Sequence, residues 1–371
     1  MPEIAVADDL AGLDARLEGL PNQPAVFLLW PLEGEPHLAR TAVLRRRLLR
    51  LLREREAPSR LLNLRHTLAR VEYWLTGSSL ESAVRMYDLA RRHFPETYLD
   101  VLRLRMPPYV KVILTNEFPR SQITTHLSRS PAVYYGPFRT RASAERFESQ
   151  FLDLFQMRRC QDDLVPSPTH PGCIYGEMGM CSRPCQQVVS ADEYHREVDR
   201  VVDFLQTSGR SLLDAASAAR DRASTELDFE QAADQHKRIQ KIGQVLALRD
   251  GLACEANRLS GVAVTASVEP KAVELWFVWQ GSWQAPRRVT FEVNEGKPVS
   301  LDQKLRETVG SLEPVAENLR ERQEHLAILA RWYYSSWCDG EWFAFDSLES
   351  LPYRKLVHAI SRVAQATSAT V

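Results

Sequence analysis

The residues of this sequence best suited to chemistry are four cysteines in one short segment: Cys160, Cys173, Cys181 and Cys185. Thiolates are soft ligands, so four of them in a loop rich in Gly and Pro could hold zinc or an iron-sulfur cluster, or pair as two disulfides. The gaps of 12, 7 and 3 residues differ from the close C-x2-C pairs of zinc ribbons. The spacing leaves the identity of the metal open.

The composition is that of a soluble globular protein. The chain has 371 residues, 44% hydrophobic and 26% charged, which is enough to bury at least two cores. Its acidic start, MPEIAVADDLAGLDARLEG, contains no apolar run, so we expect neither a signal peptide nor a membrane-spanning helix. A cytoplasmic, reducing location is therefore expected, and it disfavours disulfides at the four cysteines.

The basic residues are unevenly distributed, although the net charge is only -1. Residues 36–130 contain 18 Lys or Arg against 8 Asp or Glu, and nearly all of the basic ones are Arg. Arginine grips phosphate oxygens with two parallel hydrogen bonds, so this segment could face nucleic acid. An amphipathic helix with a solvated basic side explains the run TAVLRRRLLRLLRERE equally well.

The first part of the chain reads as a small α/β domain. Apolar runs predict strands at residues 23–30 and 35–38 before the arginine-rich helix, and further strands in VEYWLT and YVKVIL. Between these, Ser78 and Glu81 predict the start of a helix that reaches His93. We place the end of this domain at residue 139.

Helical patterns dominate the next part. Residues 140–205 are predicted to be a helical region that carries the cysteine loop, and residues 206–250 a helical hairpin interrupted at residues 226–228. Asp228 is a good N-cap with Gln231 three residues on. The second helix has an apolar stripe, and periodicity alone favours its burial inside the domain over docking to a partner.

Residues 251–371 change character to a second α+β unit. LSGVAVTAS, AVELWFVW and RRVTFEVN predict three antiparallel strands, followed by one long helix over residues 301–337. The tryptophans here are expected to be core residues. We find no phosphate-binding Gly loop, no paired-carboxylate motif and no G-x-S-x-G nucleophile. The fold class is therefore α+β multidomain.

Three motifs in this order resemble the UvrC family, the C subunit of the bacterial UvrABC excinuclease. They are GPFRTRASAERFESQFLDLFQMRRC, PGCIYGEMGMCSRPCQQVVSADEYHREVDRVVDFLQ and LDFEQAADQHKRIQKI. The resemblance implies a GIY-YIG nuclease domain at the N-terminus, a [4Fe-4S] cluster on the four cysteines, with zinc as the alternative, and a UVR hairpin that docks on a UvrB-type partner. It therefore reverses the preference for burial of the hairpin stripe. The residues that carry the hairpin match are Leu227, Phe229, Glu230, Ala232 and Ala233.

The N-terminal domain departs from the family pattern where the chemistry should lie. A GIY-YIG nuclease uses tyrosines that help to activate water, an Arg that stabilises phosphate charge and a Glu that holds a divalent metal. The resemblance places Phe27 and His37 at the two tyrosine elements and Arg47 at the Arg. Phenylalanine cannot exchange a proton, whereas histidine can.

The position of the metal-binding Glu is the decisive departure. Alignment of SSLESAVRMYDLARRHFPETY on the family puts Met86 there, and a thioether does not hold a hard cation such as Mg2+. Glu81 lies about 140° around the helix from Met86 and is a poor substitute. UvrC proteins also continue into an RNase H-like endonuclease domain and a helix-hairpin-helix module that these 371 residues do not include. Both incision centres are therefore expected to be absent or damaged.

Three hypotheses of function follow. The first is a UvrC-like scaffold that binds DNA and a UvrB-type subunit and has lost or impaired nuclease activity. The second is an active single-incision nuclease, comparable to the short UvrC homologue Cho, that uses Mg2+ with His37, Arg47 and Glu81. The third is a redox-responsive DNA-binding protein with the cluster as its sensor. The arginines that we expect to contact DNA are Arg40, Arg45, Arg46 and Arg105.

Overall fold

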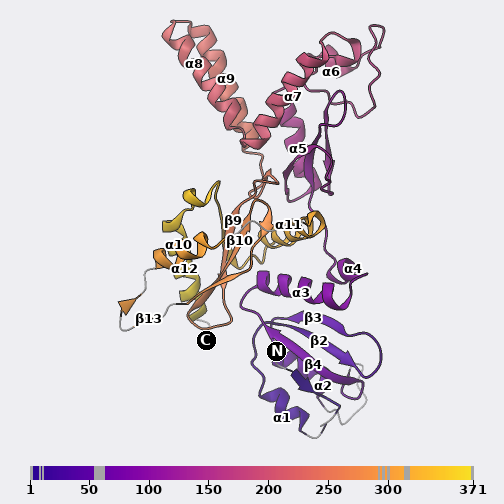
Figure 1. Cartoon of the computed structure of the whole chain (residues 1–371), viewed down its shortest axis with the longest axis vertical. Coiled ribbons are helices and arrows are strands. Elements are labelled where there is room, and N and C mark those ends of the chain that lie inside the picture. The colour runs from indigo at the N-terminus through magenta and orange to yellow at the C-terminus, as the bar shows by residue number, and fades with distance from the viewer. Residues whose placement is uncertain are drawn as a thin grey trace.

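The computed structural model describes residues 3–368 apart from 8, 9, 11, 54–62, 291, 292, 295, 296, 299, 300 and 313–317. Figure 1 shows an elongated molecule with the N-terminal domain at one end and two helical arms at the other. The mixed helices and antiparallel sheets confirm the predicted α+β class. None of the described helices is both long and apolar enough to cross a bilayer.

The N-terminal domain is an antiparallel sheet between two helical layers. The sheet order is β1-β4-β2-β3. Along β2 the side chains alternate, so that Phe27 enters the core with α1 and α2 while Val26 enters the core with α3. The elements are β1 (Glu3–Ala5), α1 (Leu13–Glu18), β2 (Ala25–Pro31), β3 (His37–Thr41), α2 (Leu44–Leu52), β4 (Leu68–Leu75), α3 (Ser79–His93) and α4 (Tyr98–Leu102).

A second sheet, of order β6-β5-β7-β8, has strands on both sides of the predicted domain end at residue 139. Its strands β5 to β7 precede that boundary but pair with one another and with β8, not with the first sheet. The alternation within a strand does not reveal which sheet it joins, and β8 lies more than a hundred residues further along the chain. The elements are β5 (Tyr109–Ile113), β6 (Arg120–Thr124), β7 (Ala132–Gly136), α5 (Arg141–Leu152), α6 (Ile174–Glu177), η1 (Pro184–Gln186), α7 (Ala191–Gln206) and β8 (Cys254–Glu255).

The predicted helical hairpin consists of α8 (Arg210–Thr225) and α9 (Phe229–Leu246). Leu227 adopts a left-handed conformation with φ of 61° at the turn. The Asp228 side chain accepts a hydrogen bond from the backbone N–H of Gln231 at 3.0 Å, as the N-cap pattern predicts. The base of the hairpin packs on α5 and α7, whereas its far end projects from the body of the molecule (Figure 1).

The C-terminal unit contains the three predicted antiparallel strands, with β10 between β9 and β12. The single helix predicted over residues 301–337 is wrong, because α10 ends at Gly310 and Asn318 caps a separate helix, α11. The elements are β9 (Gly261–Ala266), β10 (Ala272–Trp279), β11 (Ser282–Trp283), β12 (Arg287–Thr290), β13 (Val293–Asn294), β14 (Lys297–Pro298), α10 (Leu301–Gly310), α11 (Leu319–Tyr333), β15 (Gly340–Ala344), η2 (Leu348–Ser350) and α12 (Tyr353–Ser368).

Helix α11 joins the three parts of the molecule. Its buried side chains share one hydrophobic core with α3 of the N-terminal domain, with Tyr109 and Tyr134 of the second sheet, and with Trp276 of β10. Trp276 and Trp332 are buried, as predicted for core tryptophans, but Trp337 is 41% exposed. The N-terminal domain is therefore fixed to the C-terminal unit through α3.

Candidate functional site

The residues predicted to form a nuclease centre lie on different faces of the N-terminal sheet. Phe27 is buried against α1 and α2, and Arg47 is half-buried on α2. His37 is exposed at the start of β3, where it pairs in register with Leu29 of the same core. Met86 packs on the opposite face, in the core that α3 shares with α11. These four side chains do not converge on one point.

The face of α3 that carries Met86 is covered by the C-terminal unit. Between them is a cavity of about 70 Å³, lined by residues that include Met86, Arg40 and Trp337. The Arg40 guanidinium lies over the Trp337 ring, 5.4 Å from its centroid. Such a volume admits only a few water molecules, so a DNA strand and a hydrated metal ion cannot enter it.

A buried carboxylate bonds α11 to the N-terminal domain. Glu324 is 2% exposed, and its two oxygens accept hydrogen bonds from the hydroxyls of Tyr87 and Tyr98, each at 2.6 Å. Arg320 donates to the same carboxylate at 3.0 Å. Burial, and the hydrogen bond that Tyr87 gives to Glu324, raise the pKa of Tyr87, so the phenol stays protonated and keeps donating.

Two further polar contacts connect the same elements. Arg91 of α3 forms an ion pair with Glu321 of α11 at 2.7 Å. Asp339 accepts hydrogen bonds from the backbone N–H and the hydroxyl of Ser79, both at 2.5 Å, and from the Trp332 indole at 3.1 Å. The start of α3 is thus held to the segment that follows α11.

Glu81, the alternative metal ligand, is occupied elsewhere. Its carboxylate accepts a hydrogen bond from the backbone N–H of Gly77 at 2.7 Å. Burial is the main reason why the pKa of Glu81 is raised, and its charged neighbours are Glu274, Arg85 and Arg288. It therefore belongs to the contact with β10 and β12, and its charged neighbours do not include the predicted partner Arg47.

The four arginines predicted to contact DNA fall on separate surfaces. Arg45 and Arg46 lie on α2, and Arg45 also donates to the carbonyl oxygen of Glu18 at 3.4 Å. Arg40 is the residue over Trp337. Arg105 is exposed between α4 and β5, at a different cavity. No single basic face contains all four.

The four cysteines of the loop are free thiols in the structure. Cys181 and Cys185 are buried. Burial, followed by the proximity of the thiols of Cys160, Cys173 and Cys185, raises the pKa of Cys181 to about 11. The donor chemistry suits a thiophilic metal or an iron-sulfur cluster. However, within the described residues no group of three or more His, Cys, Asp or Glu side chains is arranged to hold a metal ion.

Arg158 anchors this loop and was not singled out by its sequence. Its side chain is buried, donates to the carbonyl oxygens of Phe118 at 2.9 Å and Asp162 at 2.7 Å, and lies 3.5 Å from the sulfur of Cys160. The Tyr194 hydroxyl accepts from its backbone N–H at 3.1 Å. The buried Arg158 thus fixes the start of the loop, at Cys160, against the second sheet.

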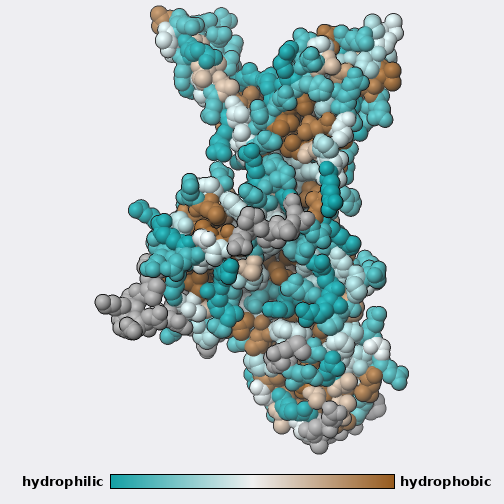
Figure 2. Space-filling model, in the orientation of Figure 1, coloured by the Kyte–Doolittle hydropathy of each residue, from teal (hydrophilic) through white to brown (hydrophobic). Residues whose placement is uncertain are grey.

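The hairpin tip exposes the residues predicted to bind a partner. Leu227 is 71% and Phe229 72% exposed, and Glu230 and Ala233 are also exposed, while Ala232 is half-buried. Figure 2 shows a small hydrophobic patch at the end of the α8–α9 arm, surrounded by hydrophilic residues. The expected stripe is therefore divided, because its base enters the core of the second sheet and its tip does not.

The comparisons with known proteins agree with this arrangement. Residues 108–204 match the family described as UvrC/Cho excinuclease, middle domain, and this range contains β5 to β7 and the cysteine loop. This part of the chain is therefore similar to the middle domain of the UvrC family. The match begins at the second sheet, close to the boundary that strand pairing indicates.

The curated relatives extend the UvrC similarity beyond this domain. The UvrABC system protein C of Lachnospira eligens is 24% identical over 292 residues, which cover 76% of this chain and 47% of the relative. That of Moorella thermoacetica is 28% identical over 252 residues, 68% of this chain and 40% of the relative. The chain thus spans less than half the length of these relatives. No solved structure matches it.

Proposed function

We propose that this chain is a UvrC-like scaffold of nucleotide excision repair that binds DNA and a UvrB-type partner without incising DNA through its N-terminal domain. The observation that carries the proposal is the covered face of α3. Met86 supplies no oxygen ligand for a hard metal, and α11 with Trp337 leaves a cavity of only about 70 Å³ beside it. A Cho-like incision centre needs an open metal site, and Glu81 is held by Gly77.

The experiment is an incision assay on lesion-bearing duplex DNA with Mg2+ or Mn2+, with and without a UvrB-type protein. The full chain is expected to leave the duplex intact in every combination. Cleavage that disappears in Arg47→Ala but persists in Arg46→Ala would overturn the proposal, because only an active N-terminal centre requires Arg47. These two arginines are neighbours on α2, so the pair controls for general loss of charge.

Partner binding is assigned to the hairpin tip. Leu227 and Phe229 are apolar and largely exposed at the end of a projecting arm, as a docking helix pair requires. Phe229→Ser should abolish binding to the C-terminal hairpin of a UvrB-type protein in calorimetry. Lys237→Ser, about two turns further along α9, should leave binding intact. If both variants bind the partner equally well, the partner site does not lie at the hairpin tip.

For the cysteine loop we propose an iron-sulfur cluster held by Cys160, Cys173, Cys181 and Cys185. When bound, such a cluster would add a covalent link between the four cysteine-bearing parts of the loop. Protein purified without oxygen should contain iron and acid-labile sulfide, and Cys181→Ser should lose both while Cys338→Ser keeps them. If the wild-type protein contains zinc and no sulfide, the four cysteines form a structural zinc site and the proposed cluster is wrong.

A further inference from the structure

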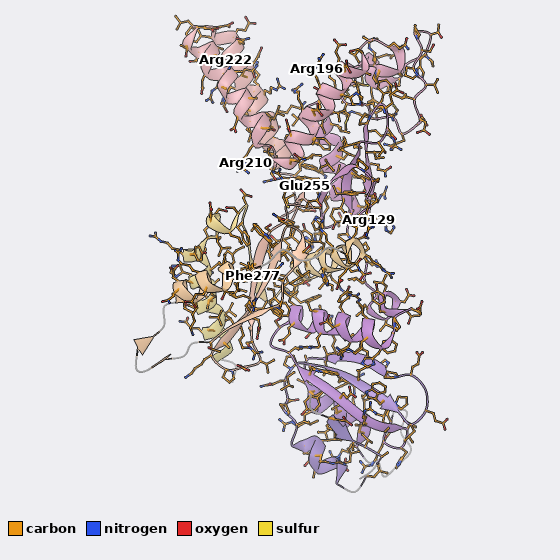
Figure 3. The ribbon with its side chains drawn as sticks, viewed as in Figure 1. Arg129, Arg196, Arg210, Arg222, Glu255 and Phe277 are labelled. Atoms are coloured by element: carbon orange, nitrogen blue, oxygen red, sulfur yellow. The ribbon has the colours of Figure 1, made fainter. Side chains whose placement is uncertain are left out.

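A groove of about 870 Å³ lies where α4, the β6–β7 loop and the start of α11 meet. Four arginines from these three segments line it: Arg103, Arg105, Arg129 and Arg320. We call it the arginine groove. Figure 3 places Arg129 beside the end of α11, far from the two helical arms. Only Arg105 among these residues was expected from the sequence to contact DNA.

We propose that the arginine groove binds the phosphodiester backbone of nucleic acid. The inference deepens the proposed function, on whose DNA binding it rests, by naming the surface that makes the contact. Three segments far apart in sequence contribute to it, and Arg320 belongs to the C-terminal unit. The site therefore exists only when α11 is docked on the N-terminal domain.

Three of the four arginines are available to a ligand. Across the residues that the structure describes, the side chains of Arg103, Arg105 and Arg129 form no ion pair, and all three residues are exposed. A solvated guanidinium without a carboxylate partner gives up no ion pair when it binds phosphate. This distinguishes them from arginines such as Arg306, which is paired with Asp302 at 2.8 Å.

The fourth arginine is already oriented. Arg320 donates to Glu324 at 3.0 Å and lies over the Tyr98 ring, 5.5 Å from its centroid, yet its side chain is 68% exposed. Two acidic residues also line the groove, Asp100 and Glu324. Glu324 is buried and accepts hydrogen bonds from two tyrosines, so it presents little charge to a ligand. The four arginines thus exceed the exposed acidic charge.

The shape of the groove fits a chain of phosphates better than a single small anion. Its volume is near the upper end for small-molecule pockets, and its cations come from separate segments along it and not from one point. Leu127 and Leu319 add apolar lining against which sugars can pack. Backbone contacts from several arginines give binding that depends steeply on salt and weakly on sequence.

The test uses the full chain with Arg105→Ala and Arg129→Ala combined. Both residues are exposed, so the thermal midpoint should not change. Fluorescence anisotropy with a labelled duplex and a labelled single strand, across a salt series, should show affinity about tenfold weaker than wild type, and a slope of log affinity against log salt smaller by about 2. If affinity falls for only one of the two probes, the groove binds the backbone of that form of DNA, duplex or single strand.

The matched control is Arg196→Ala with Arg222→Ala, which removes the same charge from the two arms in Figure 3. It should bind like wild type. Equal loss of DNA affinity in both double variants would overturn the proposal for the groove, since it would show that only net charge matters. Weakening by Arg45→Ala with Arg46→Ala, and not by the groove variant, would move the DNA to α2. Absence of DNA binding in the wild-type protein would overturn the DNA part of the proposed function as well, while the hairpin experiment would still decide partner binding.

Discussion

At the scale of single residues, the important acidic group beside α3 is a structural carboxylate, Glu324, and not a metal ligand. Met86 supplies no oxygen ligand for a hard cation, whereas Glu324 of α11 accepts hydrogen bonds from Tyr87 of α3 and Tyr98 of α4. This carboxylate satisfies two buried tyrosine hydroxyls that would otherwise lack an acceptor. The polar groups on this face of α3 therefore stabilise the fold and do not form a catalytic site.

We therefore expect Glu324→Ala to lower the free energy of unfolding by about 2–4 kcal/mol, because it leaves Tyr87 and Tyr98 without their acceptor. Glu321→Ala should cost less than about 1 kcal/mol, since its ion pair with Arg91 is 39% exposed at the carboxylate. Thermal and denaturant unfolding of the two variants would compare a buried with a half-exposed acid on one helix. Equal losses would contradict the role given to Glu324.

His325, next to these groups on α11, makes stability depend on pH. Burial lowers its pKa from 6.5, while Glu321 at 3.9 Å and Glu324 oppose the shift and Arg91 adds to it. The unfolded chain therefore takes up the proton first as pH falls, and the contribution of neutral His325 is lost below about 6.5. Between pH 7.5 and 5.5 the thermal midpoint of wild type should fall more than that of His325→Gln. His195→Gln, an exposed histidine, should behave like wild type.

At the scale of elements, the hairpin shows which features can be predicted from sequence patterns and which cannot. The N-cap Asp228 and the break before it were readable, because capping is decided by residues three apart. The apolar stripe could not be apportioned between core and partner, since both fates have the same period. Likewise, the sequence of β5 does not show which sheet the strand joins. Strand β8 is too short for an alternating pattern, and β15 lies far along the chain from its partner β9, so neither pairing could be predicted.

The divided stripe gives a matched pair of substitutions on α9. Ile242 is fully buried in the core of the second sheet, so Ile242→Ala should cost about 2–5 kcal/mol of stability. Phe229→Ala should change stability by less than about 0.5 kcal/mol, because Phe229 is 72% exposed. Denaturant unfolding decides the matter, and a large loss from Phe229→Ala would mean that the tip is structural and not a docking surface.

At the scale of the whole molecule, the covering of α3 was the least predictable feature. The sequence identified Met86 as a poor ligand, but nothing local to it indicates a helix that begins at Leu319. Its contacts join residues more than 200 positions apart, as between Tyr87 and Glu324. The arginine groove escaped prediction for the same reason, because Arg320 reaches it from the C-terminal unit.

The coupling between the N-terminal domain and the C-terminal unit can be measured directly. Asp339→Ala removes the acceptor of Ser79 and of the Trp332 indole, so amide hydrogen exchange should accelerate in α3 and α11 together. Asp346→Ala, which removes an exposed ion pair with Arg210, should leave both helices protected. Faster exchange in α11 alone would show that the two units open independently.

The same remote contact sets an order of events during synthesis. Domains form from the N-terminus as the chain emerges, at roughly 5–20 residues per second. Tyr87 leaves the ribosome 237 residues ahead of Glu324, so the apolar side of α3 waits roughly 10–50 s for α11 to arrive. Through that interval the newborn chain carries an uncovered hydrophobic surface on an otherwise complete domain, and holding that surface apart from other chains is a task for the chaperones of the cell.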